Sequence, residues 1–215
     1  MPPKPKFTRE QVIDAAYELT VESGIDAVVA REVAKKLNTT TTPIFTYFET
    51  MDQLRDEVRE KASKVCTDYL KESLNYYPAF KEFGLRWIRF SQAYPNLYSL
   101  LFMIKGMEKN SSGLVNGEFN FLRDEMKTEA MKTFGISRED ADGLFETMSI
   151  YAQGIACMYT AGVDVFDEET LSRKFSGVCL SYVAGCKICD ESINIGMFKS
   201  MLEGKNMLPK LKCES

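Results

Sequence analysis

The 215-residue sequence contains no histidine. Histidine is the commonest general base in enzymes and the commonest metal ligand, so its absence removes both roles together. A glycine-rich loop of the kind that holds nucleotide phosphates is also missing from the sequence. Catalysis would have to rest on cysteines or carboxylates alone. We therefore expect a protein that is not an enzyme, with no catalytic residues, no metal site and no cofactor.

Long apolar runs are missing too. The most apolar segment, Leu97 to Ile104, is far shorter than the about 20 residues that a membrane-spanning helix needs. No apolar run of signal-peptide length follows the basic N-terminus. Hydrophobic residues still make up 45% of the chain, enough to bury a sizeable core in one or two domains. These features predict a soluble, cytoplasmic protein with no membrane partner.

Residues 31–54 have the pattern of two short helices joined by a tight turn. Apolar residues recur at helical spacing up to Leu37 and predict a helix over residues 31–37. Asn38 tolerates the left-handed conformation in which helices end, so residues 38–40 are predicted to form the turn. Because proline is tolerated in the first turn of a helix, Pro43 favours a second helix that starts near residue 40 or 41.

This arrangement is a helix-turn-helix, which usually reads DNA. Ile44 and Phe48, four residues apart, would anchor the second helix in the core. The outward side chains are then short hydroxyls and a phenol, which can contact base edges, thymine methyl groups and phosphates. The residues that we expect to contact DNA are Arg31, Lys35, Thr40, Thr41, Thr42, Thr46 and Tyr47.

Helices are predicted on both sides of the motif. Thr8 and Gln11 have the spacing of a capping box, and Gly24 is placed to end the helix that follows. Thr50 and Gln53 have the same spacing and predict a long helix from residue 51. We place a DNA-binding domain in residues 1–50 and a second domain in residues 51–215.

The charge of the N-terminal region does not by itself indicate DNA binding. Residues 1–48 hold six acids and six basic residues, namely Lys4, Lys6, Arg9, Arg31, Lys35 and Lys36, and the whole chain has a net charge of −4. A typical nucleic-acid-binding domain is more basic. The basic start of the chain could be a mobile arm that reaches phosphates or a minor groove, or an ordinary disordered terminus. The sequence favours neither alternative.

The rest of the chain keeps a helical pattern, so the predicted fold class is all-α. Helices are indicated by apolar spacing before and after Pro95, from residue 119 to Gly135, over about residues 137–161 and from residue 168 onward. A polar loop is expected over residues 105–117, and a last amphipathic piece around residues 197–202. No segment alternates like a strand, and no internal repeat is present.

The N-terminal quarter of the chain resembles the TetR family of bacterial ligand-responsive regulators. The resemblance covers residues 8–60 and rests on the capped first helix, the glycine after it, Arg31–Ala34, the three-residue turn, Pro43–Phe48 and Met51–Leu54. The chain departs from the family at Phe45, where a phosphate-contacting tyrosine is common. It also departs at Asn38, Thr42 and Met51, where the family often has glycine, a small residue or glycine, and lysine.

The resemblance implies an all-helical second domain that binds a small-molecule effector and pairs two subunits. In the family the last two long helices form the homodimer, and they correspond to about residues 137–161 and 168–188. Close helix approach there would be allowed by small residues, namely Gly154, Ala156, Cys157, Ala161, Gly177, Ser181, Ala184 and Gly185. Such a dimer reads a palindromic double-stranded DNA operator, and repression is the family habit.

Methionines and aromatic residues of the second domain could line an apolar ligand pocket, since such side chains give adaptable walls. The candidate pocket residues are Trp87, Phe90, Phe102, Met103, Met126, Phe145, Met148 and Tyr151. Each of them could equally belong to the hydrophobic core. We expect the ligand to act by a population shift that moves the helix from Met51 onward and changes the spacing of the two DNA-reading helices.

The six cysteines allow two alternatives to a regulator that responds to a small-molecule ligand. Cys186 and Cys189 have the spacing of a redox or metal pair, but a single such pair is a weak signal. Small apolar cysteines at a tight helix interface explain them more simply. The first alternative is a DNA-binding redox sensor that uses this pair or Cys66. The second is a helical enzyme with a cysteine nucleophile, which the missing histidine makes the weaker alternative.

Overall fold

The computed structural model describes residues 7–103, 117–163 and 166–190, and in these ranges the chain is helical with no strand, which confirms the all-α prediction. The helices are α1 (Arg9–Ser23), α2 (Ala30–Lys36), α3 (Thr42–Tyr47), α4 (Met51–Lys71), α5 (Ala79–Ala93), α6 (Pro95–Phe102), α7 (Gly117–Phe134), α8 (Arg138–Thr160) and α9 (Glu168–Asp190). Short 3-10 turns, η1 (Ile25–Ala27) and η2 (Glu72–Asn75), follow α1 and α4. Residues 105–116 of the expected loop, the expected piece at residues 197–202, Lys4 and Lys6 lie outside the described residues.

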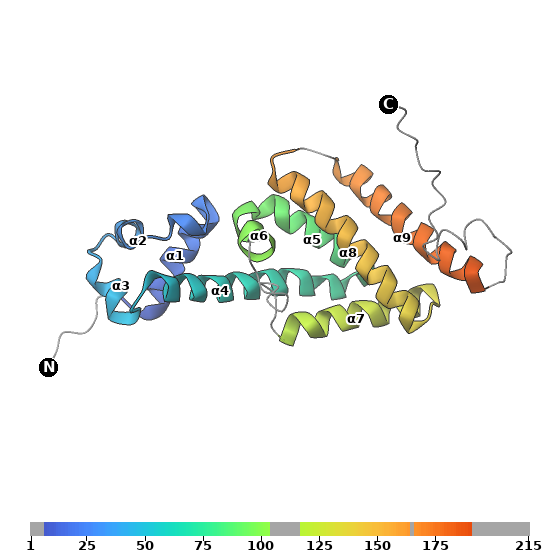
Figure 1. The fold of residues 1–215 in the computed structure, drawn as a ribbon, viewed down its shortest axis with the longest axis horizontal. Helices are drawn as coiled ribbons and strands as arrows, with labels where there is room; N and C mark the ends of the chain where they lie inside the picture. Colours follow the sequence, from blue (N-terminus) through green and yellow to red (C-terminus); the bar gives the residue numbers. More distant parts are fainter. Residues whose placement is uncertain (1–6, 104–116, 164–165, 191–215) are drawn as a thin grey trace, which may run out of the picture.

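The molecule is elongated, with α1, α2 and α3 gathered at one end and α5 to α9 at the other (Figure 1). The long helix α4 runs from the first group into the second and packs against α1, α5, α6 and α7. Within the second group, α5 lies against α4, α7, α8 and α9. Helix α5 therefore forms the centre of the C-terminal half, and α4 joins that half to the N-terminal one.

The predicted caps fix the ends of the N-terminal helices. The Thr8 hydroxyl accepts from the backbone N–H of Gln11 and the Gln11 side chain accepts from the N–H of Thr8, so the capping box is formed. Gly24, with a φ of 82°, ends α1 in a conformation that L side chains rarely adopt. The Thr50 hydroxyl accepts from the N–H of Gln53, and α4 begins at Met51 as expected.

The core of the N-terminal half is shared between α1 to α3 and the first turns of α4. Val12, Val33 and Ile44 are fully buried, and so are Leu54 and Val58 on α4. Ion pairs reinforce the packing of α1 on α4: the guanidinium of Arg9 lies 2.5 Å from the carboxylate of Glu57, and Lys61 binds Asp14. The start of α4 is therefore part of the N-terminal core, although its far end packs in the C-terminal half.

The C-terminal core depends on one very close helix approach. A Cβ atom added to Gly84 on α5 would lie 2.1 Å from Cζ of Phe175 on α9. Phe175 is 1% exposed, so its ring is enclosed by the protein. Glycine at position 84 therefore lets the ring of α9 lie directly against the backbone of α5.

A Gly84→Ala variant should lower the free energy of unfolding by about 1–3 kcal/mol, because the new methyl group overpacks the core. This loss should outweigh the roughly 1 kcal/mol by which alanine favours a helix over glycine. Urea denaturation measures the difference. Phe175→Leu removes the ring atoms that the methyl group meets, so the cost of Gly84→Ala should shrink in that background. Additive costs would show that the approach of Phe175 does not limit the packing.

No helix in the described ranges is long and apolar enough to cross a membrane.

Candidate functional site

The turn between α2 and α3 has the conformation that the sequence predicts. Asn38 has a φ of 50°, in the left-handed region. The N–H of Asn38 donates to the carbonyl of Lys35, and the N–H of Thr39 donates to the carbonyl of Ala34. This pair of bonds closes α2 as a Schellman motif. Helix α3 then begins at Thr42, slightly later than the sequence indicates, because the turn takes up the residues before it.

Helix α3 presents a polar surface to solvent. Thr40, Thr41, Thr42 and Thr46 are all exposed, as the sequence predicts. The hydroxyl of Thr46 donates a hydrogen bond to the carbonyl of Thr42, 3.0 Å away, so its proton already has an acceptor within the helix. The expected anchors are buried, since Ile44 is 0% and Phe48 2% exposed. The hydroxyls of residues 40–42 are therefore exposed at the start of a helix whose inner side is fixed in the core by Ile44 and Phe48.

The two aromatic residues between the anchors have unexpected positions. Phe45 is 51% exposed, although the sequence analysis does not include it among the DNA contacts. A phenyl ring at this position can contact a thymine methyl group. Tyr47 is half-buried, and its hydroxyl donates to the carbonyl of Phe7 at 2.7 Å. Tyr47 thus fastens Phe7, two positions before α1, to the end of α3, and a contact with DNA would compete with that bond.

The basic residues of α2 divide into two groups. Arg31 and Lys35 are exposed, and Lys35 lies 3.7 Å from Glu32 on the same helix. Lys36 instead binds two acids of α1, with N···O distances of 3.2 Å to Glu18 and 2.8 Å to Glu22. These acids raise the pKa of Lys36, chiefly because its ammonium donates a hydrogen bond to the carboxylate of Glu22. Part of the acidic charge of α1 is therefore neutralised within the protein.

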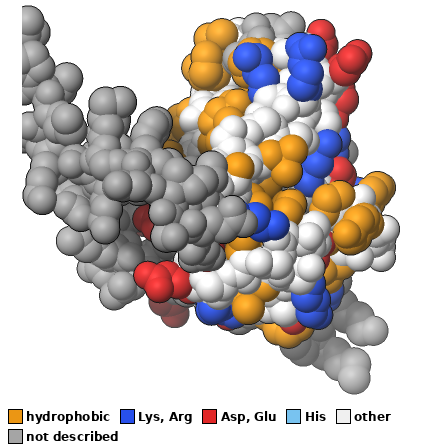
Figure 2. Space-filling view, turned by 90° about the vertical axis from the view of Figure 1, so that its right-hand side faces the viewer, with side chains coloured by type: hydrophobic (Ala, Val, Ile, Leu, Met, Phe, Trp, Pro, Cys, Tyr) orange, Lys and Arg blue, Asp and Glu red, His pale blue; other side chains and the backbone are white. Residues whose placement is uncertain are grey.

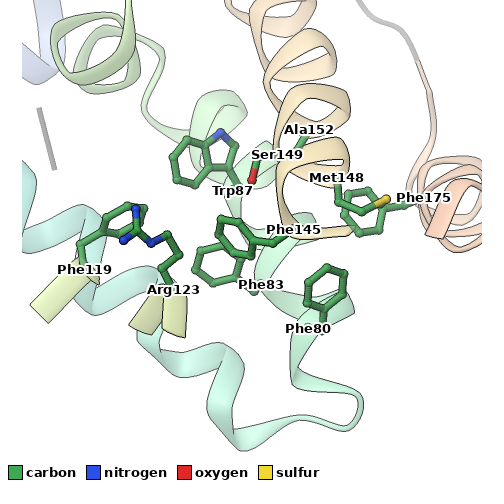
Figure 3. Close-up of a pocket in the computed structure, with 11 residues that line it drawn as sticks. Phe80, Phe83, Trp87, Phe119, Arg123, Phe145, Met148, Ser149, Ala152 and Phe175 are labelled. Carbon is green, nitrogen blue, oxygen red and sulfur yellow. The ribbon is translucent and has the colours of Figure 1, made fainter. Parts of the chain in front are cut away.

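A cavity of about 230 Å³ lies in the C-terminal half between α5, α7, α8 and α9 (Figure 3). Its lining residues are Phe80, Phe83, Gly84, Trp87, Phe119, Arg123, Phe145, Met148, Ser149, Ala152 and Phe175. The walls are therefore mainly aromatic. Trp87, Phe145 and Met148 belong to the pocket set that the sequence analysis proposes.

Two more members of that set lie directly behind the wall. The ring centroid of Phe102 on α6 is 4.6 Å from that of Trp87. The ring centroid of Tyr151 on α8 is 6.1 Å from that of Phe175. Both side chains can therefore support the shape of the cavity without lining it.

The last three members of the set are not among the lining residues. Phe90 is 1% exposed and packs between Tyr69 and Tyr94, with centroid distances of 5.6 and 5.3 Å. Met126 is fully buried beside the hydroxyl of Ser73. Met103 is 45% exposed after the end of α6. Spacing alone does not separate these residues from those that line the cavity.

Several lining residues were not recognised as pocket residues from the sequence. Phe80 and Phe83 precede Trp87 by seven and four positions on α5, so the helical spacing of aromatic residues could have found them. No sequence pattern marks Arg123 as a pocket residue, because it is one of many charged residues on α7. In Figure 3, Arg123 and Phe119 project from α7 on the left, beside the rings of Phe83 and Phe145.

A small hydrogen-bond network connects one cavity wall to α6 and α8. The indole N–H of Trp87 faces two acceptors, the Tyr98 hydroxyl at 3.2 Å and Oε1 of Gln153 at 3.3 Å. The Tyr98 hydroxyl donates to the same Gln153 oxygen at 2.5 Å. Tyr98 is 0% exposed, and this burial raises the pKa of its phenol. The phenol therefore remains a neutral donor that ties α6 to the cavity.

The described cysteines have the character of packed thiols. Burial raises the pKa of Cys66 strongly and that of Cys179 to about 11, which disfavours the reactive thiolate. Cys186 is half-buried, and the side chain of Cys189 lies outside the described residues. Within the described ranges, no group of three or more Cys, Asp or Glu side chains is placed to hold a metal ion. The burial of its thiol gives the redox alternative no support at Cys66.

Helices α8 and α9 carry an apolar outer surface, which we call the α8–α9 surface. Its exposed members are Ile150, Gly154 and Met158 on α8, Ala161 directly after α8, and Gly177, Leu180, Ser181, Ala184 and Gly185 on α9. Ile150 is 69% and Leu180 57% exposed, and a Cβ added to Gly154 or Gly177 would meet nothing within 4 Å. Of the other small residues in the expected seam, Ala156 is buried and Cys157 half-buried. Figure 2 views the C-terminal end and shows hydrophobic side chains exposed there among charged ones.

Residues 12–58 match the family model described as bacterial regulatory proteins, tetR family. The matched segment covers most of α1, all of α2 and α3, and the first turns of α4. It is the same segment whose helices share the N-terminal core, and it confirms the family resemblance seen in the sequence. No curated protein matches the chain.

Proposed function

We propose that this DNA-binding transcriptional regulator of the tetR family is a dimeric repressor, released from its operator by a small, largely apolar ligand. The observation that carries the proposal is the exposed, threonine-rich face of α3 within the matched segment. The aromatic cavity in the C-terminal half supplies a place for the ligand. We further propose that the protein acts in the cytoplasm.

Helix α3 is the proposed reading helix. A helix of this kind lies in the major groove, where hydroxyls can contact base edges and apolar groups can contact thymine methyls. The side chains exposed at its start and on its surface include Thr40, Thr41, Thr42, Phe45 and Thr46. Arg31 and Lys35 on α2 are exposed cations suited to phosphate contacts, which position a protein on DNA.

Dimer formation through the α8–α9 surface would give the protein two reading helices. Apolar exposure along one face of two adjacent helices is typical of a subunit interface. Two reading helices spaced by about one turn of DNA, roughly 34–36 Å, recognise a palindrome. The second copy multiplies the few base contacts that a single short helix can make.

Two connections could transmit ligand binding to the reading helices. Arg86 on α5 donates to the carbonyl of Tyr69 on α4 at 3.1 Å and pairs with Glu72 at 2.9 Å, so the cavity helix is attached to the far end of α4. Asn96 on α6 donates to the carbonyl of Val21 on α1 at 2.9 Å. A ligand that shifts α5 or α6 would then move α4 and α1, and with them the spacing of the reading helices.

An Asn96→Ala variant tests the second connection. It should bind operator DNA about as well as the unmodified protein but need roughly ten times more of an active ligand for half-release. The reason is that α6 loses its hydrogen bond to α1 while the cavity stays intact. Gln92→Ala, a change at an exposed amide on α5, is the control and should leave the release curve unchanged. Equal release curves for Asn96→Ala and the unmodified protein would remove α6 from the pathway.

The function is tested by binding of the purified protein to DNA from its own upstream region, at stated moderate salt and with excess nonspecific competitor. Competitor-resistant binding is the expected result. The same assay then identifies apolar compounds that release the DNA. A protein that binds no DNA fragment of its own genome more tightly than competitor would contradict the proposed function.

A further inference from the structure

The cavity wall carries one charged side chain with a buried nitrogen that no described residue satisfies. Arg123 is the one charged side chain among the described lining residues, and its buried Nε atom has no hydrogen-bond partner. The neighbouring cation on α7 differs, because Lys127 lies 2.8 Å from the carboxylate of Asp142. Buried polar groups are nearly always hydrogen-bonded, so an unpaired guanidinium nitrogen at a cavity wall indicates a missing acceptor.

The shape and chemistry of the other walls restrict what that acceptor belongs to. Six lining side chains are aromatic, and such walls favour a planar ring that packs in offset or edge-to-face contact. A cavity of roughly 150 Å³ accommodates benzene. The volume of about 230 Å³ therefore holds one aromatic ring together with a short substituent.

From these observations we infer that the cavity binds a monocyclic aromatic carboxylate, whose carboxylate is held by the guanidinium of Arg123. The inference rests on the proposed function, since it names the class of ligand that the regulator detects. A guanidinium offers paired donors that match the two oxygens of a carboxylate. The ring lies among Phe83, Phe145 and Trp87; Figure 3 shows Arg123 to the left of these three side chains, with its guanidinium over Phe119 in this view. An aromatic amine of the same size is disfavoured, because its positive charge would lie against Arg123.

The chain contains a single tryptophan, Trp87, and it lines the cavity, so its fluorescence reports binding at this site. Three probes of nearly equal shape separate charge from size: para-ethylbenzoate, the neutral para-ethylbenzamide and the cationic para-ethylbenzylamine. Titration of the full chain should show a saturable fluorescence change with the carboxylate at concentrations about 10- to 100-fold below those needed for the amide. The amine should bind more weakly still.

Two substitutions assign the preference to Arg123. Arg123→Met keeps much of the side-chain length without the charge, and should raise the Kd for the carboxylate about 10- to 100-fold while changing the Kd for the amide less than about threefold. Arg123→Lys keeps the charge but not the paired donors, and should fall between. Equal binding of carboxylate and amide to the unmodified protein, or no binding of the carboxylate up to its solubility limit, would overturn the inference even if neither variant folds.

A parallel measurement of DNA release separates this inference from the proposed function. Release of operator DNA by the neutral amide and not by the carboxylate would leave the regulator in place and show the inferred ligand class to be wrong. Carboxylate binding that depends on Arg123, in a protein that binds no DNA specifically, would support the anion site and contradict the regulator. The two proposals can therefore fail separately.

Discussion

A protein in which Thr41, Thr42 and Phe45 are all changed to alanine should lose competitor-resistant binding to its operator. All three side chains are exposed, and a good base contact contributes about 1–3 kcal/mol of discrimination, so specific affinity should fall at least about 100-fold. Folding should not change, because α3 stays anchored by Ile44 and Phe48. Electrophoretic mobility shift or fluorescence anisotropy with a labelled operator measures the loss.

Tyr47 is left unchanged in this variant because its hydroxyl supports the structure through Phe7. The control is Phe121→Ala, since Phe121 is 61% exposed on α7, outside the matched segment. This control should bind the operator as the unmodified protein does. Nonspecific binding should persist in the triple variant with a similar salt dependence, because Arg31 and Lys35 remain. Undiminished specific binding by the triple variant would show that α3 is not the reading helix.

The helix-turn-helix could be predicted because its signals are local. A capping box at Thr8, a left-handed residue at Asn38 and a proline in the first turn of α3 each act within a few residues, and each lies where the sequence places it. The alternation of anchors and exposed residues on α3 was predictable for Ile44 and Phe48 for the same reason. Local chemistry is what a single sequence displays most clearly.

The neighbouring aromatic residues show where local reasoning ends. Phe45 and Tyr47 lie in the same short helix, and the sequence pattern assigns the outward position to the phenol. The structure leaves the phenyl ring more exposed and holds the phenol against the carbonyl of Phe7, about 40 positions away in sequence. A contact across that distance depends on how α1 packs, which no spacing rule within α3 contains.

The cavity depends still more on tertiary packing. Aromatic and methionine content directs attention to the C-terminal half, but which ring faces an empty space depends on the positions of α5, α7, α8 and α9. Met126 and Met148 look alike in sequence, and only Met148 is among the lining residues. Arg123 becomes notable only when its surroundings are known to be aromatic. The sequence pattern therefore indicates the half of the chain that holds the cavity, but not which residues line it.

The second large effect should come from charge placed on the α8–α9 surface. A variant with Ile150→Glu and Leu180→Glu should be a monomer at concentrations where the unmodified protein forms the proposed dimer. Each subunit would bring two carboxylates into an apolar contact, and an unpaired charge in such a contact costs several kcal/mol. Both positions are more than half exposed within one chain, so the helical content should be kept. Light scattering after size-exclusion chromatography measures the mass.

Loss of the dimer should also weaken operator binding, because two linked reading helices gain roughly 100- to 10,000-fold over one through effective concentration. Phe121→Glu is the matched control, since it adds the same charge at an exposed aromatic residue of α7. The control should remain a dimer and bind the operator normally. A dimeric double-glutamate variant would show that subunits pair through another surface. A monomeric variant with unchanged operator affinity would instead show that one reading helix is sufficient, and would contradict the proposed palindromic operator.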